Sequence, residues 1–271
     1  MTLSIITVNL NNREGLQRTI DSVVGQTFTD YEWIVIDGGS TDGSRELIEQ
    51  YADHFAYWCS EPDKGIYNAM NKGIAHAKGE WLQFLNSGDW LYEDTTLEKV
   101  FSKEYEADVL YGDIKKQTND EKSDLKFYPD HLTLHFFYES ALCHQSSLFK
   151  RHLFNNNYYN ENLKIASDWE FTLKLYSENY KFYHIPIIIA VYTTDGISST
   201  LEDENIKERK RVLLDYVPSY FKQDVEINIK AKNKELLIHN HKLLQHIANR
   251  QERRLLFIAK IIKAIEQFRI K

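Results

Sequence analysis

Short apolar runs alternate with helical patterns over the first 90 residues, and this alternation constrains the fold more than any other feature. Leu3–Val8, Tyr31–Asp37, Phe55–Cys59 and Trp81–Leu85 are the runs expected to form buried strands. Apolar residues recur at helical spacing in the intervals: Leu16, Ile20, Val23 and Val24; then Ile66, Met70, Ile74 and Ala77. Strands that alternate with helices indicate βαβ units, so the sequence predicts an α/β fold with a mostly parallel central sheet.

The second half of the chain is less regular. The expected elements are strands at Asp108–Gly112, Leu142–Phe149 and Ile185–Tyr192, and a helix at Asp168–Tyr176. A polar loop is expected at 117–124 and a turn region rich in Asn and Tyr at 155–162. Earlier in the chain, Ser40, Thr41 or Asp42 is expected to cap a helix that runs to about Tyr51.

The composition is that of an ordinary globular protein. Of 271 residues, 42% are hydrophobic and 27% charged. Cys59 and Cys143, the two cysteines, suggest no disulfide framework and favour a reducing compartment. The first residues lack a basic segment before an apolar core, so they read as a strand rather than a signal peptide. No apolar run approaches the roughly 18 residues that a membrane span needs, and a cytoplasmic protein is expected.

Charge is distributed unevenly along the chain. Residues 231–271 hold ten Lys or Arg and three Glu, a net charge of +7, whereas the whole chain carries −7 and residues 1–230 therefore carry −14. A helical pattern from about Lys230 places one apolar stripe opposite basic residues; the stripe consists of Leu255, Ile258, Ile261, Ile262, Ile265 and Phe268. That pattern fits an interfacial helix on an anionic membrane, and it equally fits a helix packed on its own domain or on a second subunit.

Polar side chains follow several of the predicted strands. Asn9, Asp37 and Asp89 each come at or just after the end of an apolar run, and Asp63–Lys64 follows another. The carboxyl ends of parallel strands share the edge where α/β sheets bind ligands, so we expect a nucleotide site there. Any one of these residues alone is more typical of a surface turn.

The chemistry of these residues suggests which part of a nucleotide each of them would contact. Acidic side chains could bond a ribose or a base, and Lys64 or Lys72 could face phosphate oxygens. Asp89 could hold Mg²⁺ or Mn²⁺ between two phosphates, because hard cations prefer carboxylate oxygen. The strongly acidic residues 1–230 would repel a phosphate-rich ligand, and a bound cation would screen this repulsion.

Other nucleotide-binding signatures are missing from the sequence. Val8–Arg13 lacks the Gly-x-Gly-x-x-Gly of dinucleotide enzymes, and no P-loop pattern occurs. His and Cys residues show no zinc spacing, and the histidines near the end, His239, His241 and His246, fit a solvated helix face. No nucleic-acid partner is expected.

Seven segments in collinear order carry a resemblance to a known family. They are Ser4–Asn11, Ile36–Ser44, Ser60–Ile74, Phe84–Asp89, Tyr111–Asp113, Cys143–Gln145 and Ser167–Glu170. Over roughly residues 2–200 the chain resembles the family 2 glycosyltransferases of GT-A fold, and more narrowly the bacterial branch that builds O-antigen and capsule polysaccharides.

The resemblance implies an inverting transfer of a hexose from a nucleotide-diphosphate sugar, with UDP as the expected nucleotide. The acceptor would be a saccharide or a lipid-linked saccharide, which favours a place on the inner face of the cell membrane. It implies a GT-A domain over 1–204, with a nucleotide-binding half (1–112) and an acceptor half (113–204). Residues 205–271 would form a helical, basic extension.

The family's donor site maps onto particular positions of this chain. The resemblance implies donor contacts from Val8, Leu10, Asp37, Gly38, Asp63, Lys64, Lys72, Ser87 and Gly88, and a metal contact from Asp89. Asn86 and Gly88 stand where acidic residues often appear, which leaves Asp89 as the principal metal ligand. Because these acidic residues are missing, an alternative function remains open: a non-catalytic module that binds nucleotide sugars or glycans. A sugar-phosphate nucleotidyltransferase would need a Gly- and Lys-rich N-terminal loop that the chain lacks.

By the same mapping, Asp168 occupies the place of the catalytic base. An inverting displacement needs one carboxylate to take the proton of the acceptor hydroxyl, on the side away from the leaving diphosphate. An acid at this position would also suit the first turn of a helix, without any catalytic role. Glu170 is the reserve base, and His144, Gln145, Trp169 and Glu170 are expected near the acceptor or the diphosphate.

Overall fold

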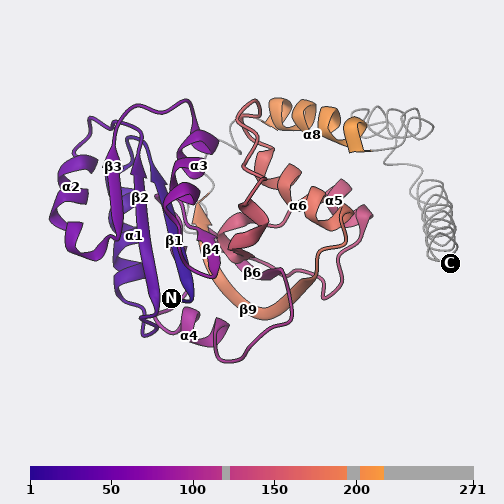
Figure 1. Cartoon of the computed structure of the whole chain (residues 1–271), viewed down its shortest axis with the longest axis horizontal. Helices are drawn as coiled ribbons and strands as arrows, with labels where there is room; N and C mark the ends of the chain where they lie inside the picture. Colours follow the sequence, from indigo (N-terminus) through magenta and orange to yellow (C-terminus); the bar gives the residue numbers. More distant parts are fainter. Residues whose placement is uncertain (118–122, 194–201, 217–271) are drawn as a thin grey trace, which may run out of the picture. The chain divides into compact units, whose positions relative to one another are not determined.

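The computed structural model describes residues 1–117, 123–193 and 202–216. Met1–Val212 form one compact unit and Leu213–Lys271 a second (Figure 1). The expected tail helix from about Lys230 lies outside the described residues. Among the described residues, no helix is long and apolar enough to cross a membrane.

The first half forms the parallel part of the sheet, as predicted. The strands β1 (Leu3–Asn9), β2 (Tyr31–Asp37), β3 (Tyr57–Ser60) and β4 (Trp81–Phe84) lie in the order β3-β2-β1-β4 and pair in parallel. The connecting helices are α1 (Arg13–Val24), α2 (Ser44–Gln50) and α3 (Ile66–His76). This parallel arrangement brings the ends of β1, β2 and β4 to one edge.

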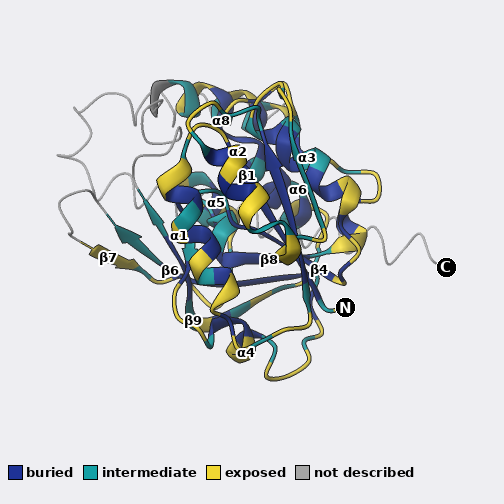
Figure 2. Cartoon of the chain, turned by 90° about the vertical axis from the view of Figure 1, so that its left-hand side faces the viewer, coloured by how far each residue is buried: buried dark blue, intermediate teal, exposed yellow. Residues whose placement is uncertain are grey.

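Alternation along the strands builds a core on each face of the sheet. Ile5 and Val35 face the side covered by α1 and α2, whereas Ile6 and Ile36 face the side covered by α3. Because successive side chains of a strand point to opposite faces, a continuous apolar run is buried on both. Figure 2 shows β1 and β4 as buried, with exposed residues on the outer faces of the helices.

The second half extends the sheet with mixed pairing. Antiparallel β8 (Ser147–Lys150) joins β4 to β6 (Val109–Gln117), and β9 (Phe182–Thr193) runs parallel to β6. The short strands β5 (Trp90–Leu91) and β7 (Ser123–Lys126) pair with β9 and β6. Long β6 and β9 curl together in Figure 1, and their register shifts beside Gly112, opposite the Pro-containing stretch 185–188. Such a bulge accommodates a proline that cannot donate to the ladder.

The helices beside this extension lie on both of its sides. In Figure 1, α5 (Leu134–Glu139), α6 (Ser167–Ser177) and α8 (Glu202–Tyr216) lie above it and α4 (Thr96–Val100) lies below it. The helix expected at Asp168–Tyr176 is confirmed as α6, whereas α4 and α5 were not expected from the sequence. α5 is a single short segment whose cap comes from Thr133, which accepts from the Phe136 N–H.

Several local expectations differ from the structure. The strand predicted at Leu142–Phe149 is only β8, because residues 144–146 form a 3-10 turn before it. β9 begins earlier than predicted, at Phe182, and β7 begins inside the predicted polar loop 117–124 and runs beyond it to Lys126. α2 has no side-chain cap of the predicted kind: Gly43, with φ of +90°, occupies the cap position. Asp42 instead accepts from the N–H of Ser44 at 3.1 Å.

Candidate active site

Asp37 fixes the ends of three neighbouring strands at the carboxyl edge of the sheet. Its buried carboxylate accepts from Asn9 Nδ2 at 2.7 Å, Ser40 Oγ at 2.5 Å and Ser60 Oγ at 2.6 Å. Burial raises the pKa of Asp37, but these hydrogen bonds outweigh burial and hold its pKa below the usual value. Asp37 therefore organises the edge of the sheet, and its contact with a nucleoside stays a prediction.

Three of the residues expected around the nucleoside do meet at this edge. A Cβ atom on Gly38 would lie 2.6 Å from Oδ2 of Asp63 and 3.2 Å from Cδ1 of Leu10, so a larger residue would displace the Asp63 carboxylate. Leu10 is 58% exposed although it follows a fully buried strand. Val8 contributes differently, because its side chain lies in the core and its carbonyl accepts from the Ser87 N–H at 3.0 Å.

The two lysines expected near phosphate differ in their partners. Lys72 Nζ lies 2.7 Å from Oε1 of Glu61, and this hydrogen bond raises the pKa of Lys72. Lys64 is exposed on the loop before α3. Both lysines border the segment that carries Asp63, so they lie on the same side of the site.

The turn 86–89 is held in place by helix α1 and by β1. Gly88 has φ of +99°, a conformation that disfavours residues with a side chain, and its N–H donates to Thr19 Oγ1 at 3.1 Å. Thr19 also donates to the carbonyl of Asp89 at 2.7 Å, and Asn12 Nδ2 donates to the carbonyl of Ser87 at 3.0 Å. The backbone thus explains why a glycine stands at 88.

Asp89 presents a buried carboxylate with few partners. Gln145 Nε2 donates to its Oδ2 at 2.9 Å, yet burial dominates and raises the pKa of Asp89 to about 6. Close by in the same turn, Oδ1 of Asn86 is buried and has no hydrogen-bond partner in the described part of the chain. Buried charges and polar atoms are costly without a partner, and a cation bound at the Asp89 carboxylate would supply one.

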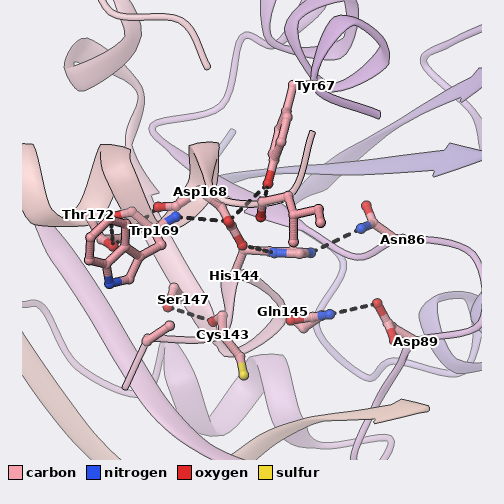
Figure 3. A network of polar contacts seen from close by, with 12 residues as sticks. Tyr67, Asn86, Asp89, Cys143, His144, Gln145, Ser147, Asp168, Trp169 and Thr172 are labelled. Atoms are coloured by element: carbon pink, nitrogen blue, oxygen red, sulfur yellow. Dashed lines mark hydrogen bonds and ion pairs between the residues drawn. The ribbon is translucent and has the colours of Figure 1, made fainter. Parts of the chain in front are cut away.

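Asp168 lies at the start of α6, where several donors surround its carboxylate (Figure 3). Its Oδ1 accepts from the Trp169 N–H at 2.8 Å and lies 3.1 Å from the Tyr67 hydroxyl. Its Oδ2 lies 2.9 Å from Nδ1 of His144. Burial raises the pKa of Asp168, but the hydrogen bond with His144 and the other donors together hold its pKa below the usual value.

The 3-10 turn at 144–146 connects this carboxylate with the turn 86–89. His144 Nε2 lies 3.0 Å from Asn86 Nδ2, while its neighbour Gln145 bonds Asp89 (Figure 3). One imidazole proton satisfies both contacts if Nδ1–H donates to Asp168 and Nε2 accepts from Asn86. The expected base, the expected metal ligand and two expected contacts thus form one polar network.

Two further residues expected at the acceptor face other partners. Trp169 is 1% exposed, and its indole N–H donates to the carbonyl of Phe137 at 3.0 Å. Glu170 accepts from Asn160 Nδ2 at 3.1 Å. Sequence reasoning missed Tyr67, although this tyrosine lies inside one of the segments that carry the family resemblance.

An α/β sheet of this topology, with a buried acid after β4 and a hydrogen-bonded carboxylate at the start of α6, defines a glycosyltransferase of GT-A fold. Residues 4–175 match the sequence profile described as glycosyl transferase family 2. The chain therefore belongs to glycosyl transferase family 2.

Curated relatives agree with that assignment. A PGL/p-HBAD biosynthesis glycosyltransferase of Mycobacterium tuberculosis is 32% identical over 217 residues, which cover 76% of this chain and 82% of the relative. Glycosyltransferase GlyA of Streptococcus pneumoniae is 30% identical over 114 residues, 41% of this chain and 16% of its own length.

Solved structures show the same fold. Staphylococcus aureus TarS 1-349 in complex with UDP-GlcNAc superposes with a TM-score of 0.64 at 21% identity, covering 83% of this chain and 70% of that one. The mannosyltransferase PcManGT of Pyrobaculum calidifontis, in complex with GDP-Man and Mn²⁺, superposes with a TM-score of 0.61 at 15% identity. The match covers 84% of this chain and 68% of that one.

Proposed function

We propose that this protein transfers a hexose from a UDP-sugar to a hydroxyl of a saccharide or lipid-linked saccharide, with inversion at the anomeric carbon. One observation carries the proposal: the carboxylate of Asp168 is held by Tyr67 and His144, and the same histidine turn reaches Asp89. A base and a separate carboxylate for the leaving group are what an inverting transfer requires.

In the proposed reaction Asp168 is the general base. The acceptor oxygen forms its bond to the anomeric carbon while the bond from that carbon to the diphosphate breaks, and the hydroxyl proton passes to Asp168. The depressed pKa of Asp168 keeps it ionised and ready to accept this proton near neutral pH. His144 orients the carboxylate through Oδ2, so that Oδ1 and Oδ2 are both fixed before the acceptor arrives.

The residues of the turn fit a divalent cation, Mg²⁺ or Mn²⁺. Asp89 would hold it, with Oδ1 of Asn86 as the other oxygen without a partner in the described residues. Such cations often take one or two protein oxygens and fill the remaining positions with water and phosphate. When bound, the cation would offset the charge on the leaving diphosphate. The complex of PcManGT with Mn²⁺ supports this proposal.

The donor would lie along the edge that holds Leu10, Gly38 and Asp63. Leu10 offers an exposed apolar contact for a base, and Asp63 a carboxylate for polar groups of the nucleoside. UDP is favoured because a structural neighbour, TarS, was solved with UDP-GlcNAc. The mycobacterial relative is named as a glycosyltransferase of PGL/p-HBAD biosynthesis, which supports a biosynthetic role for the transfer.

The proposed site of action is the cytoplasmic face of the membrane. The basic tail, +7 over residues 231–271, would add electrostatic attraction to anionic lipids of about 1 kcal/mol per basic residue. Its apolar stripe would insert, or alternatively would join a second copy of the chain.

Release of nucleoside diphosphate from a panel of nucleotide sugars tests the proposed function. We expect turnover with a UDP-hexose and Mn²⁺ or Mg²⁺, a loss with chelator, and a loss on the order of a hundredfold or more in Asp89→Ala. Nucleotide binding without turnover on any donor would instead favour the non-catalytic module.

A further inference from the structure

Helix α8 contacts the segment that leads into the catalytic helix α6. The buried carboxylate of Glu208 accepts three consecutive backbone N–H groups: Lys164 at 2.7 Å, Ile165 at 2.9 Å and Ala166 at 3.0 Å. All four residues belong to the same compact unit, Met1–Val212. The contact joins segments that are more than 40 residues apart in the sequence.

These three bonds fix the segment that leads into α6, and they do not cap the helix itself. Ala166 occupies the cap position of α6, and the helix begins one residue later, at Ser167. Buried N–H groups need an acceptor, and Glu208 supplies one for Ala166 and for the two residues before it. Asp168 follows Ala166 by two residues, so the position of this segment determines where α6 and its first acid begin.

The other contacts of this segment hold it from two more directions. From α3, the Tyr67 hydroxyl lies 2.5 Å from the carbonyl oxygen of Ile165, as well as 3.1 Å from Asp168. From α8, the Arg209 guanidinium lies 5.0 Å from the centre of the Trp169 ring, and its Nη1 lies 3.5 Å from the carbonyl oxygen of Ser140. Helix α8 therefore contacts the chain on both sides of Asp168.

We propose that Glu208 is a positioning residue that sets the place of the Asp168 carboxylate for catalysis. The inference rests on the proposed role of Asp168 as base. General-base transfer needs the carboxylate within hydrogen-bond reach of the acceptor hydroxyl, and a displacement of about 1 Å can cost on the order of a hundredfold in rate. It also makes the middle of α8 a part of the catalytic unit, beyond the 4–175 span of the family match.

The direct test is Glu208→Gln in the full chain. Glutamine keeps the shape but turns an accepting oxygen into an N–H donor that faces backbone donors, so the segment should shift. Glu204→Gln is the matched control, because Glu204 lies one turn earlier on α8, its side chain is 42% exposed, and its Oε2 lies 3.9 Å from Lys207 Nζ. If the glutamine variant does not fold, Glu208→Asp keeps the charge on a shorter side chain.

A double-mutant cycle separates positioning from general stability. We expect Glu208→Gln to lower kcat about tenfold to a hundredfold with unchanged UDP affinity, and to cost nothing further in an Asp168→Asn background. Glu204→Gln should leave kcat unchanged. A wild-type kcat in Glu208→Gln, or the same fold-loss in both backgrounds, would overturn the proposal.

A second measurement does not depend on turnover. Amide hydrogen exchange at Lys164, Ile165 and Ala166 should speed up in Glu208→Gln and not in Glu204→Gln. Unchanged exchange would overturn the inference even if the wild type proved inactive. An inactive wild type with faster exchange in the variant would contradict the proposed function alone.

Discussion

His144 Nδ1 lies 2.9 Å from Oδ2 of Asp168, while Nε2 of the same ring lies 3.0 Å from Nδ2 of Asn86. The imidazole therefore joins α6 to the turn after β4, which are contributed by different halves of the chain. Because each ring nitrogen has a partner, the tautomer and the orientation of the ring are both set. The orientation of Asn86 follows, with its Oδ1 left as a buried acceptor.

Replacement of His144 by alanine should move the acid limb of the kcat profile to higher pH. Burial raises the pKa of Asp168, and the hydrogen bond with His144 is the largest influence that lowers it. Without the imidazole the pKa of Asp168 rises, so the base is lost at a higher pH. At pH 7.5 we also expect kcat to fall about tenfold to a hundredfold, because the carboxylate is less well oriented.

His152→Ala is the matched control for that profile. His152 also faces a carboxylate, Asp108, at 3.7 Å, but it is 54% exposed and belongs to the connection after β8. It should leave the profile unchanged. An acid limb that stays in place in His144→Ala would show that His144 does not tune the base.

Asp89→Asn should make the metal-free protein more stable while it abolishes metal-dependent turnover. Burial raises the folded pKa of Asp89 from 3.8 to about 6, so ionisation in the folded state costs stability as pH rises between these values. The cost at pH 7.5 is at most roughly 3 kcal/mol, and an uncharged isostere removes it. We expect the variant's Tm to rise by several degrees at pH 7.5 and by less at pH 5.

Added Mn²⁺ provides the complementary observation for Asp89. It should raise the Tm of the wild type and leave the Tm of Asp89→Asn unchanged, because the Asp89 carboxylate is the principal ligand expected for the ion. If Asp89→Asn is less stable than the wild type at pH 7.5 without metal, the buried charge of Asp89 does not destabilise the fold and this prediction is wrong.

The parallel half of the fold was predictable because its signals are local. The apolar runs that became β1, β2 and β4 are buried on both faces, so periodicity and composition alone identified them. β3 was predicted to begin at Phe55 but begins at Tyr57, two residues later. Its four residues are only half-buried, so its apolar signal is weaker. The late strands were harder: β7 is polar and exposed, and its pairing with β6 depends on tertiary contact.

The sequence predicted several residues of the candidate site, but it did not predict which of them contact each other. Strand-end position and the family resemblance identified Asp89, Asp168, His144 and Gln145. His144 and Gln145 lie on a short turn, from which His144 contacts Asp168 and Gln145 bonds Asp89. This arrangement depends on the antiparallel pairing of β8 with β4, which the sequence did not predict. Glu208 had no sequence signal, because its partners are backbone groups distant in the chain.

Gly73→Ala should destabilise the fold although alanine favours helices. A Cβ atom on Gly73 would lie 2.4 Å from Cγ2 of Ile6, so α3 packs directly on β1 at this point. Overpacking of roughly 1–3 kcal/mol should exceed the gain of about 1 kcal/mol in helix propensity. A denaturation midpoint equal to or above that of the wild type would contradict so close an approach.

A chain that ends near Lys230 tests the tail. We expect it to keep nucleotide binding and to stop floating with anionic liposomes, whereas the full chain floats, and floats less as salt rises. If neither form binds liposomes and the shorter one changes its oligomeric mass, the tail is an assembly element.

Asp168→Asn, compared with the wild type on the preferred UDP-sugar, tests the central claim most directly. The variant keeps the shape of the side chain but cannot accept the proton from the acceptor. Single-turnover rates and UDP affinity by calorimetry should be measured together. The account predicts a rate lower by about 10²–10⁴-fold with unchanged UDP affinity. A rate close to that of the wild type, or a loss of UDP binding that accounts for the loss of rate, would contradict it.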